Sequence, residues 1–357
     1  MKKRLIALAA LALVSGMASA QSSVTLYGIV DVGLLTQNHT ADALGNDIGS
    51  THAVASRGIS PSIWGFKGTE DLGGGLKASF NLEADFSADT GAAIGPLFRR
   101  QSNVALSSDN WGTFTVGNQY SPAILAFAAT DPRGLRENFS GLYSWAYNSG
   151  ALTTSTAGTG GNNGNNDVGV FLQNAISYST KVGPVGLAAG YSVSEKRGAV
   201  YSLGATYSGP VSLSAAYQST NAPGTSDRLS TLYTLGAGYT MGDFTGKVNY
   251  LRGVNKNTPF AETKVGVMGL GVDWKTASNN TVMAAIYSGK DRNNTADKTT
   301  TLILSDEYSL SKRTTLYGQL AFAKAKAGAT LLTTVVAGGT MANENTTLLN
   351  VGVRHSF

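Results

Sequence analysis

The chain has 357 residues, of which 42% are hydrophobic and only 14% are charged, whereas an ordinary soluble domain has about 25% charged residues. Its 44 Gly, 15 Tyr and 12 Phe favour one large β-domain, and the lack of Cys excludes thiolate metal sites and disulfides. The formal net charge of +5 comes without a basic block or interleaved basic and aromatic residues, so nucleic acid is not expected as a partner. No apolar run approaches the ~18 residues of a membrane helix.

The first twenty residues have the three parts of a secretory leader. A basic start, Met1-Lys-Lys-Arg, precedes an apolar run from Leu5 to Val14 and the small-residue cleavage site Ala18-Ser19-Ala20. Residues 1–20 are therefore predicted to be a signal peptide and 21–357 the mature domain. Without the leader, 24 of the 27 basic residues remain against 22 acidic ones, a net charge of +2. Export combined with amphipathic strands predicts the outer membrane of a Gram-negative bacterium.

Strand patterns recur through the mature chain. Every second connection between them is short and rich in Gly, Pro, Asn or Asp, whereas most of the others are longer and polar. This alternation predicts an antiparallel transmembrane β-barrel, with external loops at one end, turns at the other, and both termini on the periplasmic side. The sixteen predicted strands are 24–34, 61–69, 75–87, 97–107, 113–120, 174–182, 185–194, 199–208, 211–219, 230–240, 243–253, 264–274, 281–289, 300–309, 314–325 and 346–357.

One external connection, residues 121–173, contains no convincing strand. It has aromatic residues in its first half and a stretch of Thr, Gly, Asn and Ser over 153–167. Connections this long in a compact domain are usually functional or disordered. The polar stretch cannot bury enough apolar surface to fold alone, whereas the aromatic part can become ordered.

Charged residues on predicted strands indicate a wet interior. Over residues 77–86, polar side chains alternate with apolar ones, which places Glu83 and Asp85 on the face opposite the lipid. A basic side chain facing lipid at the membrane centre costs about 2–4 kcal/mol, so the polar face is expected to line a water-filled lumen. The same pattern directs Lys67 and Asp31 inward. The alternative is that these side chains only solvate the lumen and have no specific role.

Two adjacent arginines have an ambiguous orientation. If Val104 and Leu106 face the lipid, alternation places Arg99 in the pore and Arg100 outside it. A bulge near the start of the strand, or packing against a neighbouring subunit, would reverse this assignment.

The last strand ends on an aromatic residue. Leu349, Val351, Val353 and Phe357 share one parity, whereas the other parity is mainly polar or small. We expect this strand to close the barrel beside the first one, with Phe357 in the interfacial aromatic girdle. The three histidines form no catalytic or metal-binding motif, and the sequence predicts no enzyme activity, cofactor or metal site.

Six segments of the chain resemble the general porins of the β-proteobacterial outer membrane. They are Val24-Thr-Leu-Tyr-Gly-Ile-Val-Asp, Trp64-Gly-Phe-Lys-Gly-Thr-Glu-Asp-Leu-Gly-Gly-Gly, Phe98-Arg-Arg-Gln, Trp111-Gly-Thr-Phe-Thr-Val-Gly-Asn-Gln-Tyr, Ser311-Lys-Arg-Thr and Val351-Gly-Val-Arg-His-Ser-Phe. The resemblance implies a homotrimer of sixteen-stranded barrels for passive diffusion of ions and small hydrophilic solutes. It also implies that the third external loop, here 121–173, folds into the pore and narrows it.

The same resemblance implies roles for individual residues. Arg100 lines the pore in such porins, and constriction residues in the loop correspond to Asp131, Arg133, Arg136 and Glu137, which could instead pin the loop by local ion pairs. Phe357 is expected to be recognised by the barrel-assembly machinery, and lipopolysaccharide and other outer-membrane lipids are expected partners. Family arginines are replaced by Ile63, Asn118 and Ser177, which predicts a weaker anion preference than is usual in the family.

Two other functions remain open from the sequence. The first is a substrate-specific channel in which Tyr143, Trp145 and Tyr147 form an aromatic slide for sugars. The second is an outer-membrane enzyme or adhesin, for which no catalytic set or passenger domain is visible.

Overall fold

The computed structural model describes residues 23–42, 46–149, 169–193, 198–222, 224–256, 262–337 and 340–357. The predicted signal peptide lies outside these residues. The strands are β1 (Ser23–Gln37), β2 (Thr51–Ser56), β3 (Ile63–Gly73), β4 (Leu76–Asp85), β5 (Gln101–Ser108), β6 (Gly112–Tyr120), β7 (Phe171–Val182), β8 (Val185–Ser192), β9 (Val200–Tyr207), β10 (Val211–Asn221), β11 (Arg228–Met241), β12 (Phe244–Asn255), β13 (Thr263–Ala277), β14 (Asn280–Asp291), β15 (Lys298–Ser309), β16 (Thr314–Ala325) and β17 (Asn345–Ser356). The helices are α2 (Pro122–Ala128), α3 (Gly141–Asn148) and the short 3₁₀ turn η1 (Leu331–Thr333).

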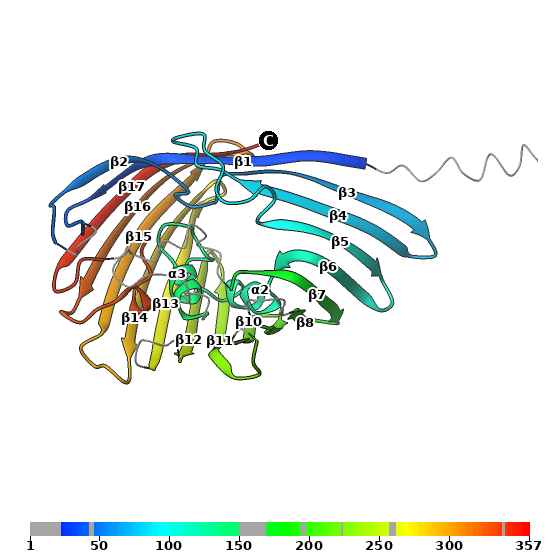
Figure 1. The fold of residues 1–357 in the computed structure, drawn as a ribbon. Coiled ribbons are helices and arrows are strands. Elements are labelled where there is room, and N and C mark those ends of the chain that lie inside the picture. Colours follow the sequence, from blue (N-terminus) through cyan, green and yellow to red (C-terminus); the bar gives the residue numbers. More distant parts are fainter. Residues whose placement is uncertain are drawn as a thin grey trace, which may run out of the picture.

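The strands form a closed antiparallel barrel (Figure 1). Each strand from β3 to β16 pairs with the next one along the chain, and β1 pairs with both β3 and β17. β1 and the fifteen strands from β3 to β17 make the predicted sixteen-stranded wall. Closure pairs both edges of the sheet that the described strands form, as membrane-spanning strands require.

The seventeenth strand, β2, was not predicted. It lies in the first external connection, where Thr51–Ser56 pair with the end of β1 beyond the point where β3 pairs. β2 and β3 therefore share one edge of β1, and residues 57–62 turn inward between them. The sequence pattern missed β2 because the strand is short and none of its residues is fully buried.

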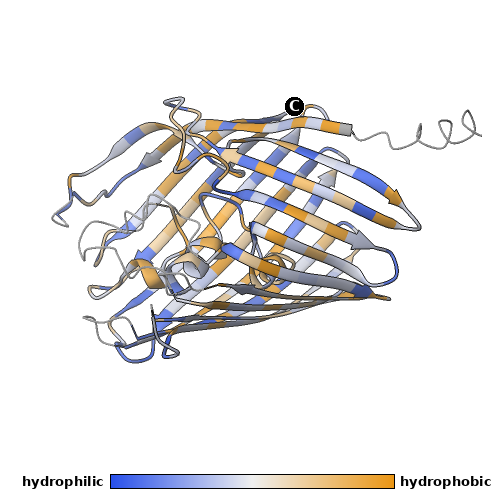
Figure 2. Ribbon diagram, turned by 45° about the vertical axis from the view of Figure 1, so that its right-hand side comes forward, coloured by the Kyte–Doolittle hydropathy of each residue, from blue (hydrophilic) through white to orange (hydrophobic). Residues whose placement is uncertain are grey.

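Hydrophobic and hydrophilic residues alternate along the strands (Figure 2). On β13, Met268 and Leu270 are exposed on the outer face, as expected for a lipid-facing surface. Val265 and Val267 on the inner face are also apolar, but they are buried in the interior of the barrel. The inner face is thus not polar throughout, because part of it packs against the inserted segment 121–149.

This inserted segment provides the hydrophobic core. Ile124, Phe127, Phe139 and Trp145 are buried together with inward residues of the wall such as Leu232. Figure 1 shows α2 and α3 inside the ring of strands. The sequence predicted the insertion but not the two helices. Among the described residues, no helix is long and apolar enough to cross a membrane.

Candidate functional site

Helix α2 lies directly on the inner wall. Ser121 caps its first turn by accepting a hydrogen bond from Ile124 N (3.1 Å), and Pro122 occupies the first turn, where a missing N–H costs nothing. Ala123 N donates to Ser202 Oγ on β9 (3.0 Å). Gly204 makes this contact possible, because a Cβ there would lie 2.2 Å from the Pro122 carbonyl oxygen.

Asp131 closes the turn between the two helices. Its carboxylate accepts hydrogen bonds from Leu135 N (2.9 Å), Gly141 N (3.2 Å) and the Tyr287 hydroxyl on the wall (3.0 Å). Burial raises the pKa of this carboxyl, although the donors from Leu135 and Tyr287 oppose the shift. Because the side chain is fully buried, it holds the loop against the wall and does not face the channel.

Arg133 is also buried, at 1% exposure. Its guanidinium donates to Gln319 Oε1 on β16 (2.6 Å) and to Ser305 Oγ on β15, and its backbone N–H donates to the Tyr287 hydroxyl (3.1 Å). The partners are neutral, so the cation is held by hydrogen bonds. Arg133 therefore anchors the loop to the wall.

Helix α3 carries the aromatic residues of the proposed sugar slide. Trp145 is fully buried, packs against Phe127 with ring centroids 5.1 Å apart and ring planes tilted by 33°, and donates from Nε1 to Gly169 O (3.1 Å). Tyr143 is 5% exposed, and only Tyr147 is partly accessible. Trp145 belongs to the hydrophobic core and Tyr143 is buried, so the three rings do not form a continuous exposed surface on which sugars could slide.

The last external loop also folds inward and holds the inserted segment. Val335 O accepts from Ser140 N (3.0 Å), and Ala337 N donates to Asn138 O (2.8 Å). Ser144 Oγ on α3 donates to Thr334 O (2.8 Å). This second inserted loop was not predicted, because its contacts to α3 join residues nearly two hundred positions apart.

A cluster of arginines and carboxylates lies at the start of β5. Arg99 donates from Nε and Nη2 to the two oxygens of Asp85, the second at 2.5 Å. Arg100 donates from Nε to Glu83 Oε1 (2.8 Å) and from Nη2 to the Tyr120 hydroxyl (2.5 Å). Both guanidiniums therefore point to the inward face of β4.

The chain can direct two adjacent arginines inward because neither lies on the strand. β5 begins at Gln101, not near 97 as predicted, and Phe98 adopts a left-handed φ of 54°. Alternation counted from Val104 and Leu106 therefore does not extend to Arg100, and the placement of Arg100 outside the barrel by that count is incorrect. The exposed outer positions of β5 itself follow the expected parity.

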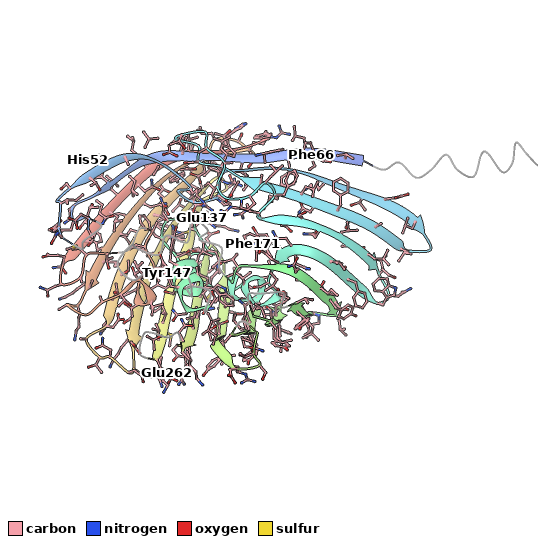
Figure 3. All side chains as sticks on the ribbon, in the orientation of Figure 1. His52, Phe66, Glu137, Tyr147, Phe171 and Glu262 are labelled. Atoms are coloured by element: carbon pink, nitrogen blue, oxygen red, sulfur yellow. The ribbon has the colours of Figure 1, made fainter. Side chains whose placement is uncertain are left out.

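Arg57 and Glu137 complete the cluster. Arg57 Nη2 donates to Asp85 Oδ2 (3.1 Å), and its Nε lies 3.5 Å from Glu137 Oε2 on the inserted loop. Figure 3 places Glu137 inside the ring of strands. We refer to Arg57, Arg99, Arg100, Glu83, Asp85 and Glu137 as the arginine–carboxylate cluster, whose formal charges cancel.

Lys67 lies beside this cluster. Its Nζ is 5.0 Å from the centroid of the Tyr27 ring, and the Tyr27 hydroxyl lies within hydrogen-bond distance of both Glu83 Oε2 (2.9 Å) and Asn81 Oδ1 (2.8 Å). Lys67 is exposed and has no carboxylate within 4 Å among the residues with described positions. It therefore adds positive charge next to a neutral cluster.

Two further predicted residues have partners away from the cluster. Asp31 is fully buried and accepts from the N–H groups of Gly58, Ile59 and Ser60 (2.8–3.0 Å) and from the Tyr317 hydroxyl (2.7 Å). Its carboxylate thus fixes the inward turn between β2 and β3. Arg136 forms a two-bond ion pair with Glu307 on β15 (2.7 and 2.9 Å).

The sequence reasoning missed Arg57, Tyr27 and Tyr120 as site residues. Arg57 falls in a connection that was predicted to be an external loop, and its left-handed φ of 73° turns it inward. The signal that could have identified it is the excess of carboxylates over arginines on the predicted inward face. Tyr27 shares the parity of Asp31 on the first strand, but its hydroxyl bond to Glu83 depends on strand register, which spacing alone does not give.

Comparisons with known proteins agree with this geometry. A family model described as Gram-negative porin matches residues 7–328. Outer membrane porin protein 32 of Delftia acidovorans is 36% identical over 382 aligned positions that cover 100% of both chains, and a porin of Bordetella pertussis is 41% identical over 144 residues, 38% of this chain and 37% of that one. An anion-selective porin from Comamonas acidovorans superimposes with a TM-score of 0.78 and 30% identity, over 94% of this chain and 100% of that one.

Proposed function

The chain belongs to the Gram-negative porin family, and from this premise we propose that the arginine–carboxylate cluster forms the constriction of its pore. The protein is an outer-membrane porin, whose barrel lets ions and small hydrophilic solutes diffuse passively. Transport of this kind needs no covalent step, and selectivity depends on pore width and on charges at the narrowest point. The observation that carries the proposal is the Arg57–Glu137 ion pair, which joins the inserted loop to the turn before β3.

We propose that the constriction gives only a weak anion preference. Each arginine of the cluster has a carboxylate partner, so the cluster contributes little net charge. The nearby positive charge of Lys67 remains, and Lys77 lies further along the same inward face. The related protein from Comamonas acidovorans is described as anion-selective, and a smaller preference is expected here.

The test is the reversal potential in a salt gradient across a planar bilayer, measured for Arg100→Gln. Removal of one positive charge next to Glu83 should shift the potential toward cations. Arg313→Gln, an exposed position in the turn before β16, is the matched control and should leave the potential unchanged. An unchanged potential in Arg100→Gln would show that this residue does not act on the permeating ions.

We propose that the candidate site residues have one of two roles, either at the constriction or in holding the inserted segments. Glu83, Asp85, Glu137, Arg57, Arg99 and Arg100 act at the constriction, with Lys67 next to them. Asp31, Asp131 and Arg133 hold the inserted segments, because each is hydrogen-bonded to backbone groups or neutral side chains that fix a turn or the inserted loop. Arg136 is assigned to the lumen because it is partly exposed in its pair with Glu307.

We also propose a homotrimer, an expectation supported by a structural relative, OmpT of Vibrio cholerae, that is described in a trimer form. Migration of the unheated protein at three times the monomer mass on a denaturing gel would support it, and migration as a monomer after mild extraction would oppose it.

We further propose that residues 1–20 are removed on export, so amino-terminal sequencing of the mature protein should begin at Gln21.

A substrate-specific sugar channel is the second candidate, but the aromatic slide that suggested it is buried. The two functions differ in their response to solutes. A passive pore should show conductance that rises in proportion to salt concentration and is not blocked by sugars. Saturable block by one sugar would favour the substrate-specific channel.

A further inference from the structure

A row of hydrogen-bond donors crosses the inner wall on the periplasmic side of the arginine–carboxylate cluster. In cross-strand register, Thr25 on β1 lies opposite Lys67 on β3, and Lys67 lies opposite Asn81 on β4. Side chains directly opposite each other on one face have Cβ atoms about 4.5–5.5 Å apart. The hydroxyl, the ammonium and the amide of these three residues are therefore neighbours, and we call them the donor row.

The donor row lies in a part of the wall that the inserted helices leave open. Helices α2 and α3 pack against strands β8 to β13. Figure 1 shows β1, β3 and β4 side by side, away from both helices. Thr25 and Lys67 have inward parity and are exposed, so water in the lumen reaches them. A solute that crosses the constriction passes directly beside this row.

The donors of the row are available to a solute. Lys67 Nζ lies 5.0 Å from the centroid of the Tyr27 ring and forms no hydrogen bond or ion pair with any residue that the structure describes. The Asn81 side chain turns its oxygen to the Tyr27 hydroxyl (2.8 Å), which leaves the amide nitrogen to donate elsewhere. An ammonium beside an amide N–H matches the two oxygens of a carboxylate.

The Tyr27 ring provides a flat apolar surface next to the donor row. A Cβ on Gly65 would lie 3.0 Å from Tyr27 Cζ, so one face of the ring rests against the backbone of β3. The hydroxyl is held 2.9 Å from Glu83 Oε2 on β4. Because the wall and this contact fix the ring from one side, its other face is turned to the lumen, where the ring is partly accessible.

Glu83 limits which anions fit beside the ring. Its carboxylate lies next to the Tyr27 hydroxyl and pairs with Arg100 (2.8 Å), at the external end of the site. A solute with its carboxylate on the donor row and its body on the Tyr27 ring directs its far end toward Glu83. Like charges at short range repel each other. The site therefore favours a solute with one carboxylate and an uncharged body.

We propose that the donor row and the Tyr27 ring form a binding site for aromatic monocarboxylates such as benzoate. The carboxylate binds to the donor row, and the aromatic ring packs against Tyr27. The Lys67 ammonium exchanges its contact with the Tyr27 ring for the carboxylate, and this frees the ring face for the solute. Aromatic rings pair in offset or edge-to-face arrangements that an aliphatic ring cannot reproduce. The proposal rests on the passive channel and adds the class of solute that the pore retains beside its constriction.

The test measures how far an added anion lowers the single-channel chloride conductance in a planar bilayer at constant ionic strength. Benzoate is compared with cyclohexanecarboxylate, which has the same charge and a similar size but no aromatic ring. The concentration that halves the conductance should be about threefold lower for benzoate. Terephthalate, with a second carboxylate at its far end, should block less than benzoate. Equal half-blocking concentrations for benzoate and cyclohexanecarboxylate, or stronger block by terephthalate, would overturn the proposal.

Variants of the site locate the binding residues. Lys67→Gln should raise the half-blocking concentration of benzoate about tenfold, because it removes the charged donor. Tyr27→Leu should remove the difference between benzoate and cyclohexanecarboxylate. Lys181→Gln is the matched control, since Lys181 is also an exposed lysine of inward parity but lies at the periplasmic end of β7, and it should leave the block by benzoate unchanged. Equal effects of Lys67→Gln and Lys181→Gln would contradict the assignment.

Two further measurements separate the site from folding and from the pore itself. Tyr27→Phe retains the ring and should retain the preference for benzoate, and loss of the preference in this variant would contradict the role of the ring. Conductance in potassium chloride alone tests the passive channel. A channel that conducts chloride but does not distinguish benzoate from cyclohexanecarboxylate contradicts the aromatic site only, whereas a protein without ion conductance contradicts the channel.

Discussion

Arg57 Nε lies 3.5 Å from Glu137 Oε2, so the turn before β3 and the inserted loop are joined by an ion pair inside the barrel. The same guanidinium donates to Asp85 at 3.1 Å. One cation thus connects a carboxylate of the wall to a carboxylate of the loop. Both side chains of the pair are largely buried, and a buried charge left without its partner is costly.

The first prediction concerns this pair. Arg57→Gln should shift the reversal potential toward cations, and Glu137→Gln should shift it toward anions, because each variant leaves the other charge without its partner. The double variant should lie close to the unchanged protein. A double-mutant cycle on thermal unfolding should give a coupling of about 0.5–3 kcal/mol, the usual range for residues in contact. Additive effects in both measurements would show that the two residues do not interact.

The second prediction concerns the contact between α2 and the wall. Gly204→Ala places a methyl group 2.2 Å from the Pro122 carbonyl oxygen, so the helix must move toward the pore axis. Single-channel conductance should fall, and the overpacking should cost about 1–3 kcal/mol of stability. Gly318→Ala is the control, because its nearest neighbour is 3.9 Å away. Equal conductance in both variants would indicate that α2 does not rest on the wall at Gly204.

The third prediction concerns pH and the first external loop, where His39 Nδ1 lies 2.5 Å from Asp47 Oδ2. The hydrogen bond to Asp47 raises the pKa of His39, and the bond to His39 lowers the pKa of Asp47. The stability that His39 contributes to the folded state is therefore fully present below its ordinary pKa near 6.5 and is lost as pH rises through the raised pKa. The stability that Asp47 contributes is present above its ordinary pKa and is lost as pH falls through the lowered pKa.

An NMR titration of the His39 ring checks the direction of its pKa shift, and the variant His39→Gln identifies which signal belongs to this ring. The midpoint should lie above 6.5 in the unchanged protein and should move down in Asp47→Asn. A midpoint at or below the ordinary value, or one insensitive to Asp47→Asn, would contradict the pair.

The fourth prediction concerns Phe357, which pairs with Gly28 through two backbone hydrogen bonds (3.0 and 3.2 Å). A Cβ on Gly28 would lie 2.3 Å from the Phe357 ring, so the ring lies directly over that glycine. If the barrel-assembly machinery recognises Phe357, then Phe357→Ala should reduce the amount of folded protein in the outer membrane and leave single-channel conductance unchanged.

Phe322→Ala is the matched control for this experiment, since Phe322 is a similarly exposed aromatic residue on the outer face. Its yield should stay near that of the unchanged protein. Equal yields for the two variants would mean that Phe357 acts only as an interfacial aromatic.

Much of the fold could be predicted because the lipid imposes alternation on the strands. The inward placement of Lys67, Glu83 and Asp85 follows from that rule alone. The rule does not extend to Arg100, because Phe98 breaks the regular backbone before β5 begins. It also cannot show that Val265 and Val267 face the interior, since their apolar partners come from the inserted loop.

The site was less predictable than the wall because its contacts join distant parts of the chain. Asp31 was expected in the lumen, but whether a carboxylate faces water or caps a turn depends on where residues 58–60 lie. Arg57 contacts Asp85 and Glu137, 28 and 80 positions away, and no spacing pattern links them. Arg133 was a candidate for the constriction, yet its partners Ser305 and Gln319 are on the far wall.

The most direct test of the central claim is the reversal potential of the unchanged protein in a tenfold potassium chloride gradient. Because the arginines of the cluster are paired with carboxylates and Lys67 is not, we predict a potential of the anion-selective sign that is well below the ~59 mV of a perfectly selective channel. A potential close to that limit would show that the arginine charges act on permeating ions unscreened, and a potential of the cation-selective sign would show that the carboxylates dominate. Either result would contradict a charge-compensated constriction.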